Sequence, residues 1–436
     1  MPEPVPELKD APPRDRFLAT AALYAALVVA VFAHQLFPEL GARGVLADAE
    51  VLSAELHATD ETPWGLGRLE PYCYRPLFRA LVLGAWGALG GVPETFYGVF
   101  VTLSALSLLG AAWAFDALLR AQGFAPRDAA AGVALFLLGF PVLFAYDVPI
   151  HTREDLLGYA LIAVTLLFVA RDRPVEVALL GALGATVRET CLLGVLPFAL
   201  VSRRPWRERL LVYAPGGLVW LLVRLVQAPP GGSDYDYVAV STRPLLERPG
   251  EAALYLFATF GALWIAAGLR LCCDPRPPRH PLLARRVCLV ALAAVAATGW
   301  TMGMIREARI TYVLFPFVVA PALDLFTSPR AARLARAPAA WAAGLAVVLA
   351  GAGGLAWLAA DAEARVPRLR GVIGDEFHPG VLQVLEVPED DGSVRLLEEP
   401  VFASFGNGPH VLLHLAASAF LLAGWRATRD AGAKAA

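Results

Sequence analysis

Apolar runs separated by short polar turns recur along the chain from residue 17 to residue 426. Most runs hold about 20 residues, the length that an α-helix needs to cross a hydrocarbon core of roughly 30 Å. The pattern predicts an all-α polytopic membrane protein with about twelve transmembrane helices. The predicted helices cover residues 17–37, 94–118, 128–145, 154–170, 175–187, 190–202, 208–227, 251–271, 286–304, 309–326, 338–359 and 408–426.

The charges in the turns orient these helices. Arginines gather in short turns, for example at 203–209 and 270–286, and basic residues in short loops mark the cytoplasmic side. Both termini are therefore predicted to be cytoplasmic. The large first outer loop, 38–93, is rich in acidic residues and carries an apolar, glycine-containing segment at 76–92. We interpret this segment as an interfacial or re-entrant helix, because a full span there would shift the topology by one helix.

This topology divides the chain into three parts. Residues 1–360 form the transmembrane domain, 361–407 a small extracytoplasmic segment, and 408–436 the last transmembrane helix with a cytoplasmic tail. Within the extracytoplasmic segment, VLQVLEV and SVRLLEE flank the turn sequence PEDDG. Two apolar stretches joined by such a turn predict a small β-hairpin.

One stretch, 171–204, departs from the pattern of full-length spans. A basic cluster stands at each end of it, and Arg188 and Glu189 lie in the middle of the apolar run. If both basic clusters are cytoplasmic, the run enters the membrane and returns. Its two arms, 175–187 and 190–202, are then helices of about 20 Å each, so their turn lies below the outer surface. The alternative is one long tilted helix with an internal Arg–Glu pair.

Composition narrows the class of protein. With 57% apolar and 17% charged residues, the chain does not fit a soluble globular protein, and a net charge of -2 excludes a nucleic-acid binder. Lys9 and Lys434 are the only lysines, and this bias toward arginine is typical of GC-rich bacterial genomes. We therefore predict a multi-pass protein of the bacterial inner membrane. Five cysteines do not make a disulfide framework.

Ionisable residues at the membrane converge on the predicted outer face. They include Asp48 and Glu50 after the first helix, Asp155 at the start of the fourth, and the Arg188-Glu189 pair. Charges at membrane depth are costly and usually mark a functional site. Arginines bind phosphate groups, and a carboxylate activates a hydroxyl acceptor or holds a metal. This combination suits an enzyme that uses a membrane-anchored phosphate donor.

Four short motifs carry a resemblance to a known family. They are ADAEVL after the first helix, PYCYRPLFRALV at 71–82, REDLLGYALIAVTLLFVARDRP followed by LLGALGATVRETCLLGVLPFAL, and IREARITYVLFPFVVAP at 305–321. In this layout the chain resembles the GT-C superfamily of integral-membrane glycosyltransferases. The resemblance implies transfer of a sugar from a polyprenyl-phosphate donor, with the active site facing outward and membrane lipids around it.

The resemblance also implies roles for individual residues. By position, Asp48 is the catalytic base or a metal carboxylate, with Glu50 secondary and Asp155 a second-loop acid. Arg188 or Arg306 would bind the lipid phosphate. The other predicted substrate-binding residues are Glu189, Arg309, Tyr74, Arg75, His151 and Arg153.

Metal use is open in this interpretation. Glu50 stands where many members of the superfamily keep Asp, and this departure leaves a divalent cation such as Mg²⁺ or Mn²⁺ as an open alternative with no metal ligand assigned. His410 and His414 share a helix face, but no glutamate follows the first histidine as zinc proteases require. We therefore predict no metal site at these histidines.

Two other classes of protein compete with the transferase. A transporter or flippase for a lipid-linked or anionic solute also uses broken helices and charge pairs at membrane depth. The two halves of the chain show no internal repeat, which argues against it. A non-catalytic membrane assembly subunit would use the acidic loop and the outer hairpin as partner surfaces.

Overall fold

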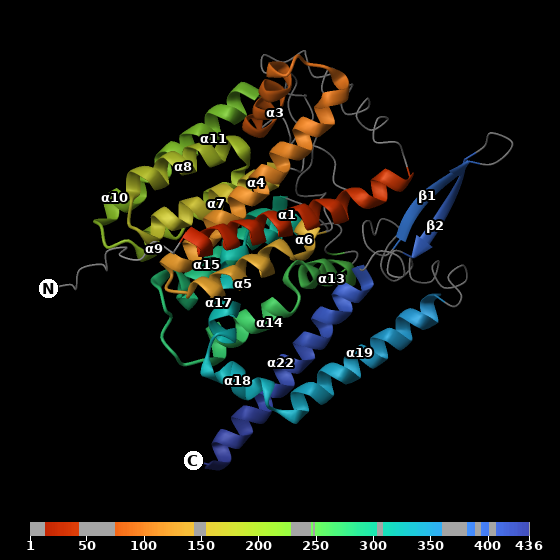
Figure 1. The fold of residues 1–436 in the computed structure, drawn as a ribbon. Helices are drawn as coiled ribbons and strands as arrows, with labels where there is room; N and C mark the ends of the chain where they lie inside the picture. The colour runs from red at the N-terminus through yellow and green to blue at the C-terminus, as the bar shows by residue number, and fades with distance from the viewer. Residues whose placement is uncertain are drawn as a thin grey trace.

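The computed structural model describes residues 14–42, 75–143, 154–227, 246, 249–302, 308–359, 382–388, 394–400 and 407–435. This part of the chain is predominantly helical (Figure 1). Three of its helices are long and apolar enough to cross a membrane, or four if the bent pair Pro329–Ala335 and Pro338–Gly354 is one span. The topology of about twelve helices stays a prediction.

The bounds of the elements follow the predicted runs in most places. The first half holds α1 (Arg14–Ala42), α3 (Pro76–Ala88), α4 (Pro93–Ala121), α5 (Pro126–Leu137), α6 (Phe140–Leu143), α7 (Glu154–Ala170), α8 (Pro174–Val187), η3 (Glu189–Gly194), α9 (Phe198–Val201), α10 (Trp206–Leu211) and α11 (Tyr213–Gln227). Prolines open α3, α4, α5 and α8, where the missing N–H costs no hydrogen bond.

The second half has more interruptions. It holds α13 (Pro249–Phe260), α14 (Ala262–Gly268), η4 (Leu269–Cys273), η5 (Pro281–Leu283), α15 (Arg285–Met302), α16 (Ala308–Tyr312), α17 (Phe315–Phe326), α18 (Pro329–Ala335), α19 (Pro338–Ala359), β1 (Leu382–Pro388), β2 (Val394–Pro400) and α22 (Asn407–Ala435). Strands β1 and β2 pair antiparallel, with Leu385 opposite Leu397. They occupy the two segments that flank PEDDG.

A cluster of buried aromatic rings forms the centre of the bundle. Phe115 of α4, Phe136 of α5, Tyr159 of α7, Tyr312 of α16 and Phe315 of α17 pack edge to face or stacked. The Tyr312 hydroxyl donates a hydrogen bond to the Phe136 carbonyl oxygen. These contacts join the first and second halves of the chain, and they fix the ends of α5 and α16.

Several helices predicted as continuous are broken. Residues 128–145 divide at Gly139, where the Tyr312 ring fills the space of a Cβ atom. Residues 251–271 divide at Gly261, which has a positive φ of 50° that favours glycine. There the Nδ1 atom of His414 accepts a hydrogen bond from the Ala262 N–H at 3.1 Å. Residues 309–326 divide between α16 and α17.

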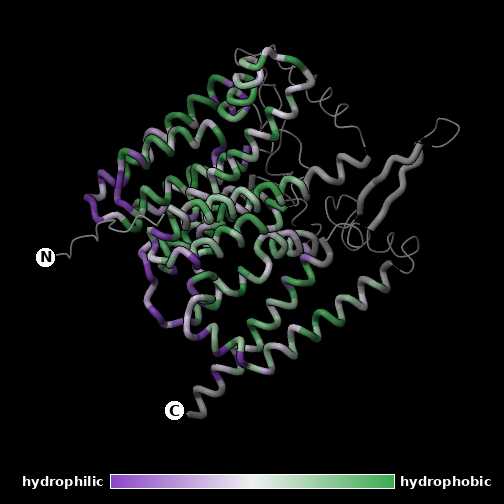
Figure 2. Tube along the Cα trace, viewed as in Figure 1, coloured by the Kyte–Doolittle hydropathy of each residue, from purple (hydrophilic) through white to green (hydrophobic). Residues whose placement is uncertain are grey.

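Several helices present apolar side chains to the outside. On α19, Trp341, Leu345 and Leu349 are 64%, 59% and 64% exposed, and α8 and α11 carry similar exposed stripes. Figure 2 shows these outer helices as mainly hydrophobic. Water-soluble monomers rarely expose apolar surface on this scale. The helices are therefore membrane-like, with apolar stripes that suit contact with lipid.

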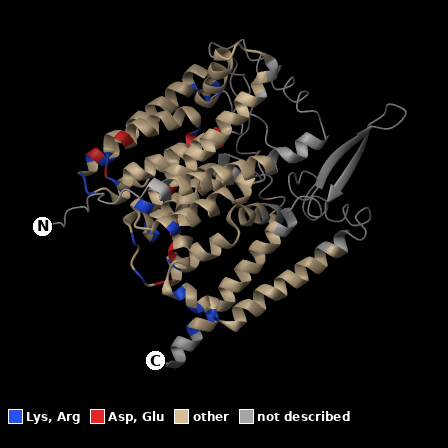
Figure 3. Ribbon diagram, in the orientation of Figure 1, with Lys and Arg blue, Asp and Glu red and all other residues tan. Residues whose placement is uncertain are grey.

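The arginine-bearing turns lie on one side of the molecule. Contacts join them in pairs: the Arg279 guanidinium over the Phe124 ring, Arg286 to the Leu200 carbonyl oxygen, Ser202 to Asp172, and the Arg330 guanidinium over the Trp425 ring. In Figure 3, basic residues, coloured blue on the ribbon, follow the same edge of the bundle. This gathering agrees with the predicted alternation of the helices, in which all of these turns share a compartment.

Candidate functional site

The stretch 171–204 contains the break predicted at Arg188 and Glu189. Helix α8 ends at Val187, and Arg188 has an extended backbone, with φ of -165° and ψ of 139°. The chain then forms the 3-10 helix η3 and the single α-turn α9. One unbroken helix through this stretch is therefore wrong. The second arm also differs from prediction, since residues 190–202 form tight turns rather than a regular α-helix.

The two ends of the stretch meet on the side of the arginine-bearing turns. The Ser202 hydroxyl donates a hydrogen bond to Asp172 Oδ1 at 2.7 Å, and Arg204 Nε lies 3.5 Å from Asp172 Oδ2. Asp172 has a positive φ of 52°, which reverses the chain between α7 and α8. The run therefore enters the bundle and returns to its starting side, as its basic ends predicted.

Small residues make room for the tight second arm. A Cβ atom at Gly184 of α8 would lie 2.7 Å from the Cβ atom of Cys191, which is closer than side chains pack. A Cβ atom at Gly216 of α11 would lie 2.7 Å from Leu192 Cδ2. Glycines at such contacts let helix backbones approach closely inside a membrane. Segment η3 thus packs against α7 and α8, and its Leu192 lies against Gly216 of α11.

Five ionisable side chains meet at the break. The Arg188 guanidinium forms an ion pair with the Asp155 carboxylate. Arg75 donates from one terminal nitrogen to Glu154 Oε1 at 2.8 Å and from the other to Glu189 Oε1 at 3.3 Å. We call these five residues the α7–η3 charge cluster. It joins three segments that are far apart in the sequence, namely the start of α3, the start of α7 and the start of η3.

The charge cluster is buried except at one edge. Arg75, Glu154, Asp155 and Arg188 are all less than 5% exposed, whereas the Glu189 side chain keeps 35% of its surface. Buried charges are tolerated only when they are paired, and here Arg75 is hydrogen-bonded to Glu154 while Arg188 forms an ion pair with Asp155. Glu154 and Asp155 also stand in the first turn of α7, where the helix dipole favours negative charge. A ligand would therefore reach the cluster from the side of Glu189.

The cluster lies at membrane depth under the predicted topology. Helix α8 has 14 residues, so Arg188 is about 21 Å along the helix from the turn at Asp172. That distance is shorter than a hydrocarbon core of roughly 30 Å. The position agrees with a turn that ends below the far surface.

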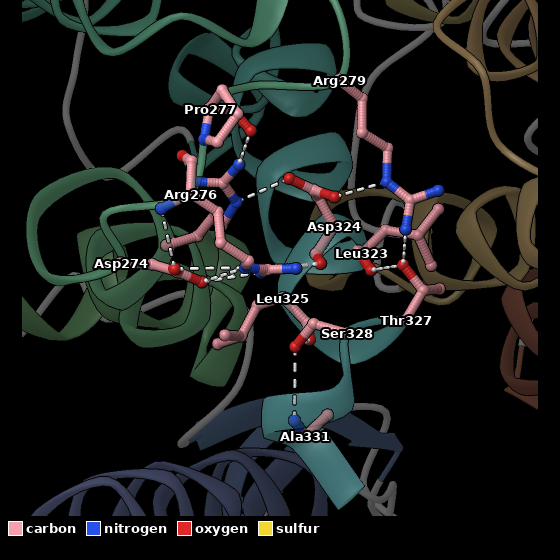
Figure 4. A network of polar contacts seen from close by, with 11 residues as sticks. Asp274, Arg276, Pro277, Arg279, Leu323, Asp324, Leu325, Thr327, Ser328 and Ala331 are labelled. Carbon is pink, nitrogen blue, oxygen red and sulfur yellow. Dashed lines mark hydrogen bonds and ion pairs between the residues drawn. The ribbon is translucent and has the colours of Figure 1, made fainter. Parts of the chain in front are cut away.

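A second polar network fixes the arginine-rich segment 274–284 (Figure 4). Asp324 of α17 accepts from Arg270 Nε at 2.5 Å and from Arg279 Nε at 2.6 Å. Arg276 binds the Asp274 carboxylate at 2.6 Å. Burial by itself would raise the pKa of Asp274, but the hydrogen bonds from Arg276 hold that pKa below its usual value. Because each carboxylate oxygen of Asp324 accepts from an arginine, we interpret this network as structural.

Four of the predicted site residues lie together in the structure, and the side chains of the others are not among those described. Asp155, Arg188, Glu189 and Arg75 belong to one cluster. Arg309 lies in α16, where only the backbone is described. The remaining predicted residues fall outside the described ranges: Asp48, Glu50, Tyr74, His151, Arg153 and Arg306.

Glu154 is the member of the cluster that the sequence interpretation missed. It precedes Asp155 directly, and adjacent acids at the start of an apolar helix were the available signal. Its importance depends on Arg75, which lies 79 residues away in the sequence. Only the fold brings the two together.

The charge cluster does not fit a divalent cation. Glu154 and Asp155 each bind an arginine, and the positive guanidinium groups would repel a metal ion. Among the described residues, no group of three or more His, Cys, Asp or Glu side chains could hold a metal ion. His410 and His414 have ring centroids 4.5 Å apart, but His414 already accepts from the backbone of α14.

Comparisons with protein-family models, with curated proteins and with solved structures found no match to this chain. The fold and the site therefore define the protein by their own features. It is a predominantly helical protein with membrane-like helices and a buried cluster of arginines and carboxylates at a broken helix.

Proposed function

We propose that the chain is a GT-C-type glycosyltransferase of the bacterial inner membrane. It would move a sugar from a polyprenyl-phosphate-linked donor to an acceptor on the extracytoplasmic face. The observation that carries the proposal is the α7–η3 charge cluster, in which a predicted phosphate-binding residue, Arg188, is held by a predicted acid, Asp155. The motif resemblance and the membrane-like helices support the same conclusion.

The chemistry of transfer assigns different tasks to the two kinds of charge. The acceptor oxygen bonds to the anomeric carbon while the bond from that carbon to the phosphate oxygen breaks. Negative charge develops on the leaving phosphate, so a fixed guanidinium stabilises the transition state more than the ground state. The acceptor hydroxyl loses its proton to a carboxylate within hydrogen-bond reach.

Within this scheme Arg188 and Arg75 are the proposed phosphate-binding groups. Their own carboxylate partners hold them in place before the donor arrives, so little reorganisation is needed. Asp155, bound to Arg188, suits the task of positioning that guanidinium. Asp48 is then our first candidate for the base, as the resemblance implies, with Glu50 second.

The proposed membrane arrangement has about twelve helices and both termini in the cytoplasm. The gathering of the arginine-bearing turns on one side supports it. Helix α3 has 13 residues, about 20 Å, which is too short for a full span and supports an interfacial or re-entrant segment at 76–92. The proposed site opens outward.

The experiment supplies the purified protein in nanodiscs with a polyprenyl-phosphate sugar, adds a cell-envelope extract as the source of the hydroxyl acceptor, and measures release of polyprenyl phosphate. Asp48→Asn should abolish turnover and leave donor binding largely intact. The double variant Arg188→Gln/Asp155→Asn, which removes both charges and keeps a polar side chain at each position, should weaken donor binding as well. The matched control is Arg204→Gln/Asp172→Asn, a partly exposed pair on the opposite side. Full turnover by both test variants would rule the proposal out.

A flippase or transporter is the second candidate, and one observation favours it. The backbone is unwound at Arg188 and again at Gly261, and broken helices commonly form the central binding sites of transporters. In sealed proteoliposomes a flippase would move the intact lipid-linked sugar across the bilayer and release no polyprenyl phosphate. A non-catalytic assembly subunit would do neither.

A further inference from the structure

Four exposed arginines converge where α18 meets the last part of α22. Arg333 lies in α18 and Arg336 directly follows that helix, whereas Arg426 and Arg429 lie in α22. The two segments touch closely, because a Cβ atom at Gly424 would lie 3.4 Å from the Leu334 carbonyl oxygen. We call these four residues the arginine corner. Figure 3 shows basic residues in blue where these two helices meet.

The guanidinium groups of the corner have no acidic partner within the described part of the chain. Three other arginines on the same side each bind an acid: Arg204 binds Asp172, Arg276 binds Asp274 and Arg279 binds Asp324. Four positive charges with no acidic partner among the described side chains repel one another and attract an anion. The corner therefore differs from the neighbouring networks, which neutralise their own charges.

An apolar stripe begins beside the corner. Trp341, Leu345 and Leu349 follow one another at every fourth position of α19, and each is more than half exposed. The Trp341 indole N–H donates to the Ala335 carbonyl oxygen at 2.8 Å, which ties the start of the stripe to α18. Helices α18 and α19 meet at an angle of 62°. Tryptophan at such a place is typical of the membrane–water interface.

We propose that the arginine corner and the stripe together bind an anionic phospholipid of the inner leaflet. The lipid phosphates would contact the guanidinium groups, which bind phosphate in a bidentate manner, and the acyl chains would lie along Trp341, Leu345 and Leu349. Basic sites between transmembrane helices on the cytoplasmic side suit a headgroup with two phosphates. This inference is independent of the proposed transferase, because it uses none of the charge-cluster residues.

The test measures lipid retention by the full-length protein in native mass spectrometry. Cardiolipin and phosphatidylglycerol are compared with phosphatidylcholine, and inorganic phosphate is offered as a competitor. The wild type should keep cardiolipin in preference to phosphatidylcholine. The variant Arg333→Gln/Arg336→Gln/Arg426→Gln/Arg429→Gln should lose this preference, with affinity falling about fivefold for each arginine removed.

A matched control removes the same charge elsewhere. Arg127, Arg171, Arg203 and Arg285 are exposed arginines on other turns of the same side, and they too have no ion pair within the described residues. Their fourfold change to Gln should leave cardiolipin retention intact. An equal loss of cardiolipin retention in this control would show that retention depends only on the net charge of the protein, and it would overturn the proposal.

A third variant separates a lipid from a free anion. Leu345→Asn/Leu349→Asn changes only the stripe and should weaken cardiolipin binding while the arginine corner is unchanged. If inorganic phosphate displaced cardiolipin at equal concentration, the site would be one for a free anion. If the stripe variant kept full retention, the stripe would not bind the acyl chains. Either result would overturn the proposal. Circular dichroism and gel filtration of each variant establish that it is folded before retention is compared.

Discussion

The Arg188 guanidinium binds the Asp155 carboxylate, and the two residues are only 3% and 4% exposed. The pair ties the point where α8 stops to the first turn of α7. Without it, the extended residue at the tip of the re-entrant stretch would carry a buried positive charge alone. The pair is therefore both a structural tie and the centre of the proposed site.

Removing one partner of this pair should destabilise the protein strongly. Arg188→Leu leaves Asp155 buried without its guanidinium, and breaking a buried pair in this way costs about 3–5 kcal/mol. Arg188→Leu/Asp155→Leu removes both charges and should recover much of that loss. The free energy of unfolding in SDS titrations measures both effects and gives the coupling between the two residues.

The same cycle at Arg204 and Asp172 provides the comparison. These side chains are 38% and 44% exposed, so their coupling should stay below about 1 kcal/mol. If the single variant Arg188→Leu were no less stable than the double variant, Arg188 would not depend on Asp155 and the description of the site would be wrong.

A methyl group added at Gly184 should loosen the re-entrant stretch. The new Cβ atom would meet Cys191 Cβ at 2.7 Å, so η3 has to move away from α8. We expect Gly184→Ala to lower the free energy of unfolding by about 1–3 kcal/mol, the usual range for overpacking. It should also raise the rate at which a maleimide reaches the buried Cys191 thiol.

Gly217→Ala is the matched control for this substitution. Gly217 also lies inside a helix, but nothing lies within 4 Å of its Cβ position. Because Ala has a higher helix propensity, the change should stabilise α11 by up to about 1 kcal/mol. Similar losses in both variants would show that helix propensity, and not the contact with Cys191, governs these positions.

The sequence predicted features set by local pattern and missed those set by distant contacts. The break at Arg188 followed from the two basic ends and the length of the run, which limit how far the chain can travel. The pairing of Glu154 with Arg75, and the divisions at Gly139 and Gly261, depend on side chains from other helices. The spacing of apolar residues along one helix contains no information about such contacts with other helices.

The prediction of a regular α-helix for the second arm, residues 190–202, was wrong for a related reason. Apolar composition at 190–202 fits a helix, and only the glycines of neighbouring segments make the tighter path of η3 possible. Asp324 was missed because its arginine partners lie 54 and 45 residues away. An isolated acid in an apolar helix indicates burial, but it does not identify the partner.

Cysteine labelling tests the proposed sidedness. Cys272 and Cys273 are exposed, whereas Cys191 and Cys288 are buried. In a Cys73→Ala background, a membrane-impermeant maleimide should modify Cys272 and Cys273 in inverted vesicles and leave them unmodified in intact spheroplasts. Labelling of these two residues from outside would place the segment 274–284 in the outer compartment and reverse the topology. Permeabilised spheroplasts are the control for reagent access.

Acidification should open the segment that follows these cysteines. Burial lowers the pKa of His280 below its ordinary value of 6.5, and its Nδ1 atom accepts from the Leu282 N–H at 3.2 Å. Between its folded-state pKa and 6.5, the unfolded chain binds more protons, so stability falls as the pH drops through this window. The maleimide labelling rate of Cys288, whose thiol faces the Leu282 carbonyl oxygen, should rise from pH 7 to pH 5 relative to the rate in the variant His280→Asn.

The variant is the control, because Asn keeps an acceptor for the cap and does not titrate. The ratio of the two labelling rates at each pH therefore cancels the reagent's own pH dependence. A constant ratio would mean that His280 does not control this segment.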